Sequence, residues 1–175
     1  MIFKGLKLKS AQKFIKSQLA KKADNKGLQS QQIDRVGCIV DADRFPAVEK
    51  LDLLYEALNL KSNALSVISY FEDKKQSQEF SGLSFCDNDF GWKGSVIGED
   101  LKQFLLQPYD LLINYYDDNG KIGLQLASVH TKKSFATGFY GINESLNDII
   151  IHSDIESYKD FILELKKYLE ILNKI

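Results

Sequence analysis

Acidic side chains follow two apolar segments of the chain, each at the point where a strand would end. CIVDAD places Asp41 and Asp43 after a β-branched run, and LLINYYDD places Asp117 and Asp118 after a second run. Carboxylates grouped at a strand end can attack phosphorus, transfer a proton or hold Mg²⁺. The same residue types also start turns and cap helices. Two interpretations therefore stay open, an acidic site and a set of polar loops.

Alternating strands and helices would position these residues. The apolar patterns predict strands over residues 35–41, 64–71, 82–89, 109–116, 134–141 and 148–153, and helices over residues 45–60, 98–107, 121–131 and 155–175. Near-continuous apolar strands between amphipathic helices indicate an α/β, three-layer Rossmann-like fold, with a mostly parallel sheet and helices on both faces. Such sheets bind ligands outside the carboxyl ends of their strands, where these acidic residues are expected to lie.

The N-terminal segment is strongly basic although the whole chain has a formal net charge of -1. Residues 1–26 contain eight lysines and one acid, Asp24. Apolar residues and one glutamine recur there at helical spacing: Phe3, Leu6, Phe14, Ile15, Gln18 and Leu19. We therefore predict a basic amphipathic helix over residues 1–26 and a single α/β domain over residues 35–175. The candidate binding residues of the helix are Lys4, Lys7, Lys9, Lys13, Lys16, Lys21 and Lys22.

A lysine-rich helix of this kind can pack its apolar stripe on the domain and leave its charges in water. It can also bind an acidic protein, an anionic membrane surface or RNA, because all three carry negative charge. Aromatic residues in loops and at strand ends add candidate contact residues, since aromatic side chains are enriched at interfaces. These are Trp92, Tyr115, Tyr116 and Tyr140.

Composition and the remaining motifs narrow the classes of protein. Hydrophobic residues make up 44% and charged residues 27% of the 175 residues, as in a soluble globular domain. No segment approaches the roughly 20 apolar residues that span a bilayer. The N-terminus also lacks the apolar core of a signal peptide, so we expect a cytoplasmic protein. The cysteines and histidines lack metal-ligand spacing and no glycine-rich phosphate loop is present, so we predict no cofactor and no metal.

The acidic segments resemble motifs of one enzyme family. CIVDAD resembles the first motif of the haloacid-dehalogenase-type phosphatases, and LLINYYDD is similar to the late acidic pair of that family. The resemblance implies that Asp41 is a nucleophile and Asp43 a general acid. It also implies that Asp117 and Asp118 hold Mg²⁺.

Two longer resemblances concern larger parts of the chain. The segment PYDLLINYY…LQLASVHTKKSFATGFYG is similar to the N-terminal half of heptosyltransferase-type (GT-B) glycosyltransferases, and implies a fold without catalytic residues. The segments DFGWKG, DLLINYY, ESLNDIII and LKKYLEILNKI resemble a small uncharacterised family of Bacteroidota cytoplasmic proteins of unknown function.

These observations favour a non-enzymatic α/β interaction module that contacts an acidic, membrane-surface or RNA-containing partner through its basic N-terminal helix. One alternative is a Mg²⁺-dependent phosphatase-like enzyme, which requires the four carboxylates to converge around one metal. Another alternative is a sugar- or nucleotide-binding domain derived from a glycosyltransferase half, with a pocket beside residues 114–116 and 138–141.

Overall fold

Six parallel strands form the central sheet of the computed structural model. The structure describes the backbone of residues 2–24 and 32–175 and the side chains of residues 5–21 and 32–175. The strand order is β3-β2-β1-β4-β5-β6, and every neighbouring pair is parallel. The strands are β1 (Val36–Asp41), β2 (Leu65–Tyr70), β3 (Ser84–Phe85), β4 (Tyr109–Tyr115), β5 (Lys133–Phe139) and β6 (Ile149–Ile151). The predicted α/β, Rossmann-like fold is confirmed.

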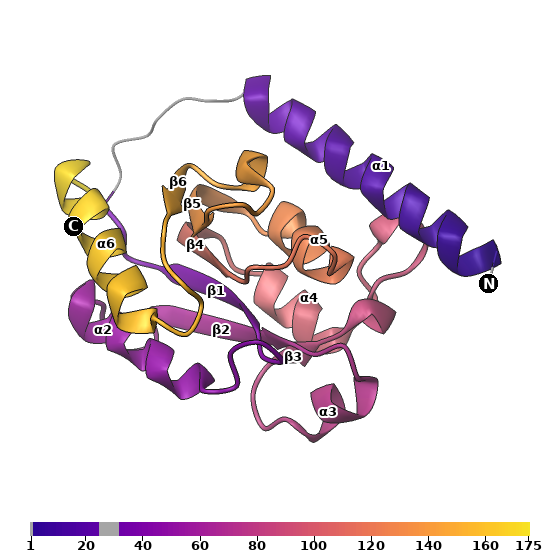
Figure 1. Cartoon of the computed structure of the whole chain (residues 1–175), viewed down its shortest axis with the longest axis horizontal. Coiled ribbons are helices and arrows are strands. Elements are labelled where there is room, and N and C mark those ends of the chain that lie inside the picture. The colour runs from indigo at the N-terminus through magenta and orange to yellow at the C-terminus, as the bar shows by residue number, and fades with distance from the viewer. Residues whose placement is uncertain (1, 25–31) are drawn as a thin grey trace.

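Helices cover both faces of this sheet (Figure 1). On one side, α2 (Leu53–Ala57) packs against α6 (Tyr158–Ile171). On the other side lie α4 (Glu99–Leu105) and α5 (Ile122–His130), and α1 (Ile2–Asp24) packs on the outside of α5. The described connections contain α3 (Lys74–Glu79) and the short 3-10 helices η1 (Val48–Asp52), η2 (Asp87–Asp89), η3 (Trp92–Gly94) and η4 (Glu144–Leu146).

The structure differs from the predicted elements in two places. The strand predicted over residues 82–89 has only two residues, because a helical turn begins at Asp87, and Asp89 within it accepts the Cys86 backbone N–H at 2.8 Å. The sequence pattern also does not identify α3, whose six residues are all polar. Asp73 starts that helix by accepting the Lys75 backbone N–H at 2.6 Å.

The core lies on both faces of the central strands. All six residues of β1 are buried, which explains why its sequence is apolar without alternation. Gly37 in this strand lies against the Tyr109 ring, since a Cβ built on Gly37 would be 2.9 Å from Tyr109 Cγ. Four aromatic rings fill the space near β4, β5 and α6, namely those of Phe45, Tyr115, Phe139 and Phe161.

One side of α1 is fixed to the domain. Ala11 and Ile15 are buried, and the Phe14 ring stacks on His130 with centroids 4.9 Å apart. His130 Nε2 lies 2.7 Å from the Gly94 carbonyl oxygen, so this contact joins α1 and α5 to η3. Burial lowers the pKa of His130, which favours the neutral ring. Leu6 does not belong to the packed stripe as predicted, because its side chain is 48% exposed.

Candidate functional site

The strand order creates a topological switch point between β1 and β4. From β1 the chain runs outward through β2 and β3, and it then returns to β4 on the other side of β1. The loops after β1 and β4 therefore leave the sheet in opposite directions, and Rossmann-like folds bind ligands in the crevice between such loops. Asp41 ends β1, and Asp117 follows β4 closely, so two of the predicted acidic residues border this crevice.

Asp41 is fully buried and pairs with Lys121, the residue directly before α5. Lys121 Nζ lies 3.0 Å from Asp41 Oδ1 and 2.8 Å from Asp41 Oδ2. The Arg44 backbone N–H also donates to Asp41 Oδ1, at 3.3 Å. Burial raises the pKa of Asp41 above its ordinary value, while the Lys121 ammonium group opposes that rise. A buried ion pair therefore occupies this part of the crevice.

Lys121 also faces two further carboxylates. Its Nζ lies 3.1 Å from Glu72 Oε1 and 3.9 Å from Asp43 Oδ2. Asp43 Oδ2 accepts the Glu72 backbone N–H at 2.8 Å, which holds the two acidic loops together. Burial alone would lower the pKa of Lys121, but the hydrogen bonds and charges of Asp41 and Glu72 outweigh burial and raise it. One ammonium group thus connects the ends of β1 and β2 to the start of α5.

Asp117 belongs to a separate ion pair. Arg44 donates from Nη2 to Asp117 Oδ2 at 2.9 Å and from Nε to Asp117 Oδ1 at 3.3 Å. Asp118 instead accepts the Gly120 backbone N–H at 2.6 Å within a turn. In the described part of the chain, no three Asp, Glu, His or Cys side chains gather closely enough to hold a metal ion. The four predicted carboxylates are thus divided between two cations and a turn.

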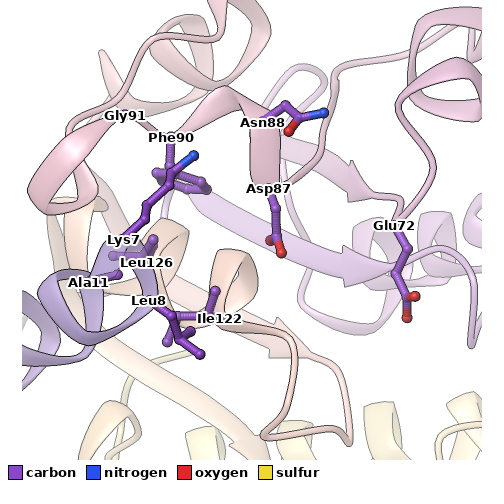
Figure 2. A pocket seen from close by; sticks show the side chains of 10 residues that line it. All are labelled: Lys7, Leu8, Ala11, Glu72, Asp87, Asn88, Phe90, Gly91, Ile122 and Leu126. Atoms are coloured by element: carbon purple, nitrogen blue, oxygen red, sulfur yellow. The ribbon is translucent and has the colours of Figure 1, made fainter. Parts of the chain in front are cut away.

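A cavity of about 420 Å³ lies next to the Lys121 ion pairs and beneath α1 (Figure 2). Its volume is within the range of small-molecule binding sites. Apolar side chains form much of its wall, namely Leu8, Ala11, Phe90, Ile122 and Leu126. Its polar side chains are Lys7, Glu72, Asp87 and Asn88. The sequence did not predict this cavity, because its walls come from segments far apart in the chain.

Gly123 allows Asp87 to approach the first turn of α5. A Cβ built on Gly123 would lie 2.5 Å from Asp87 Oδ1 and 2.9 Å from Tyr70 Cε2. The Tyr70 hydroxyl donates to Asp87 Oδ1 at 3.0 Å, so the position of this carboxylate is fixed. A carboxylate beside a helix N-terminus also has a favourable interaction with the helix dipole.

We expect Gly123→Ala to lower the free energy of unfolding by about 1–3 kcal/mol, because the added methyl group must displace Asp87 or the Tyr70 ring. This loss exceeds the gain of about 1 kcal/mol that alanine brings to a helix interior. Gly5→Ala in α1 is the matched control, since nothing lies within 4 Å of its built Cβ, and it should be slightly stabilising. Urea unfolding followed by circular dichroism measures both changes. A more stable Gly123→Ala protein would show that the contact is loose.

The outward face of α1 is basic. Lys9, Lys13, Lys16 and Lys21 are exposed, whereas Lys7 is half-buried at the cavity. None of these four exposed lysines forms an ion pair with another described residue. The side chains of Lys4 and Lys22, which were also predicted to bind, lie outside the described residues. Although α1 spans 23 residues, neither it nor any other described helix is long and apolar enough to cross a membrane.

The aromatic residues predicted as contacts divide into two groups. Trp92 is 54% exposed in η3, which packs against α1, and Tyr140 is 62% exposed. Tyr140 borders an open depression of about 540 Å³ that also contains Arg44. Tyr115 and Tyr116 are fully buried, which corrects the prediction that they contact a partner. Both faces of β4 are covered, so neither side chain reaches the surface.

A protein-family profile covers most of the chain. The profile described as "Family of unknown function (DUF6913)" matches residues 7–172. No curated protein and no solved structure matches the chain.

Proposed function

The chain belongs to the family of unknown function DUF6913, and we propose that it is a cytoplasmic, non-enzymatic binding module that holds an acidic protein partner through the exposed lysines of α1. We refer to these residues, Lys9, Lys13, Lys16 and Lys21, as the lysine face. The observation that carries the proposal is that all four side chains are exposed, and that Lys9, Lys13 and Lys16 lie on the side of the helix that faces away from the buried Ala11 and Ile15.

The packing of α1 makes the lysine face a fixed feature of the surface. Ala11 and Ile15 are buried beneath the helix, and Phe14 stacks on His130. A partner therefore meets ammonium groups that already lie on one rigid helix, and binding does not have to order the backbone. Such a cluster creates a local positive potential that speeds encounter with an acidic surface, even though the net charge of the whole chain is only -1.

The chemistry of this surface supports a protein partner over a membrane or RNA. Amphipathic helices that bind membranes insert a continuous apolar side between lipids. In α1, Ala11 and Ile15 are buried on the domain, and the exposed large hydrophobic side chains described in it are Leu6 and Leu8. The exposed residues described in α1 include no arginine and no aromatic residue, which RNA-binding surfaces commonly use to stack bases. Trp92 lies exposed beside the helix and supplies the type of anchor that dominates protein interfaces.

The strand-end carboxylates give less support to catalysis. Asp41, the implied nucleophile, is fully buried and bound to Lys121. Asp117, an implied Mg²⁺ ligand, is held at both oxygens by Arg44. These contacts occupy the groups that would have to meet a phosphate ester or a metal.

The test compares two variants with the same change in charge. The first replaces the four residues of the lysine face with glutamine, and the second replaces four exposed lysines elsewhere, namely Lys61, Lys74, Lys159 and Lys167. Both are measured at low and physiological salt against poly-L-glutamate, phosphatidylserine vesicles and single-stranded RNA, with Trp92 fluorescence as the readout. We expect the first variant to bind poly-L-glutamate at least about tenfold more weakly and with less salt dependence.

Affinity purification of the tagged protein from its source cells should show the same contrast for the native partner. An acidic protein should be captured by the wild type and the control variant and lost from the lysine-face variant. If both variants lose the partner equally, the lysine face is not the surface that binds it. Capture of lipid or RNA alone would reject the acidic protein as partner.

A further inference from the structure

The cavity beneath α1 combines free groups of both charges. Asp87 uses Oδ1 to accept the Tyr70 hydroxyl, and Glu72 uses Oε1 to contact Lys121. Among the residues that the structure describes, no donor contacts the second oxygen of either carboxylate. Each carboxylate can therefore still accept a hydrogen bond from an ammonium group of a ligand.

Lys7 contributes the opposite charge to the same cavity. Figure 2 shows Lys7 on one side, Glu72 on the opposite side and Asp87 between them. Lys7 is half-buried, and its ammonium group has no partner among the described residues. A ligand carboxylate in the cavity would give this ammonium group a charged hydrogen-bond partner.

The wall between these charged groups is apolar. Phe90 and Leu126 are 2% exposed, and Leu8 and Ile122 complete this wall. A volume of about 420 Å³ is large enough for an amino acid or a short peptide and small for a macromolecule. The position of the cavity, outside the carboxyl ends of β2 and β3, is where sheets of this type bind small ligands.

We propose that this cavity binds a zwitterionic ligand with an apolar side chain, of the class of free amino acids and short peptides. The ligand ammonium group lies against Asp87 and Glu72, its carboxylate lies against Lys7, and its apolar side chain packs on Phe90 and Ile122. This site is separate from the lysine face, and it does not depend on the proposed partner.

Three probes with the same ring and different charges test the proposal: L-phenylalanine, phenethylamine and 3-phenylpropionate. Titrations of the full chain are followed by amide chemical shifts and by the fluorescence of Trp92, which is the only tryptophan in the sequence and follows Gly91 of the cavity lining. We expect L-phenylalanine to bind most tightly, and its contacts to shift the resonances of Phe90, Ile122 and Leu126.

Two variants separate the charges. Asp87→Asn keeps an acceptor for the Tyr70 hydroxyl. It should weaken the binding of L-phenylalanine and phenethylamine about tenfold and leave the binding of 3-phenylpropionate unchanged. Lys7→Gln should weaken the binding of L-phenylalanine and 3-phenylpropionate and leave the binding of phenethylamine unchanged. Asp118→Asn and Lys159→Gln are the matched controls outside the cavity and should leave the binding of all three probes unchanged. Equal binding of the three probes, or no binding by any of them, would overturn the proposal whatever the lysine face binds.

Discussion

Replacing Lys121 with methionine is expected to lower the free energy of unfolding by about 3 kcal/mol at neutral pH, because it leaves a buried carboxylate without its cation. Asp41 is fully buried, and its strongest partner is Lys121 Nζ at 2.8 Å. Asp43 and Glu72 lose the same ammonium group. Methionine retains most of the apolar stem of lysine, so the loss reports mainly on charge.

This loss should depend on pH, since the charged form of Asp41 causes it. Burial raises the pKa of Asp41 in the folded protein above its value in the unfolded chain. The folded state therefore binds the Asp41 proton more tightly, and stability from this group falls as the pH rises through the folded-state pKa. Without Lys121 that pKa rises further. The deficit of the variant should be smallest at acidic pH, below the raised pKa of Asp41, and largest at neutral pH.

Two further proteins complete this experiment, in which urea unfolding is measured across the acidic and neutral range. Lys102→Met removes an exposed lysine that pairs with Glu99 at 2.7 Å, and it should cost less than about 1 kcal/mol. The double variant Lys121→Met with Asp41→Asn should recover much of the lost stability, because no buried charge remains. If Lys121→Met unfolds at the same urea concentration as the wild type at neutral pH, the ion pair is not needed for stability.

Ile15→Asp is expected to detach α1 while leaving the sheet folded. Ile15 is 4% exposed and belongs to the hydrophobic core, so a carboxylate at this position would be buried among apolar side chains. Most of the stability of a helix in a protein comes from its tertiary packing, so a detached α1 should lose much of its helical structure. Amide hydrogen exchange in residues 5–21 should then accelerate on the order of 100-fold, whereas amides of β1 and β4 remain protected.

Lys16→Asp provides the control, because it places the same carboxylate one residue later on the exposed side of the helix. Its exchange pattern should match that of the wild type. Unchanged protection of α1 in Ile15→Asp would show that contacts other than the Ala11 and Ile15 stripe hold the helix.

The sequence was informative where local pattern determines structure. Apolar runs located the six strands, and placing Asp41 and Asp117 at strand ends required only that the strands be parallel. The apolar run of β4 also implied that both of its faces are covered. Tyr115 and Tyr116 belong to that run, so their burial could have been inferred from the same signal.

The partners of the acidic residues could not be predicted in the same way. Lys121 and Arg44 lie in loops, and which carboxylate each meets depends on how the connections after β1 and β4 fold back over the sheet. Lys121 stands directly before an apolar helix, but the same position would suit any polar residue. No short stretch of the sequence predicts the cavity beneath α1, because the cavity depends on packing between distant residues such as Lys7, Asp87 and Ile122.

The docking of α1 against α5 also constrains how the chain folds during translation. Phe14 leaves the ribosome before His130, the ring on which it stacks, because His130 is made more than a hundred residues later. At about 5–20 residues per second, the helix waits on the order of ten seconds for its packing surface. During that time Phe14 and the buried side of α1 have no α5 to pack on.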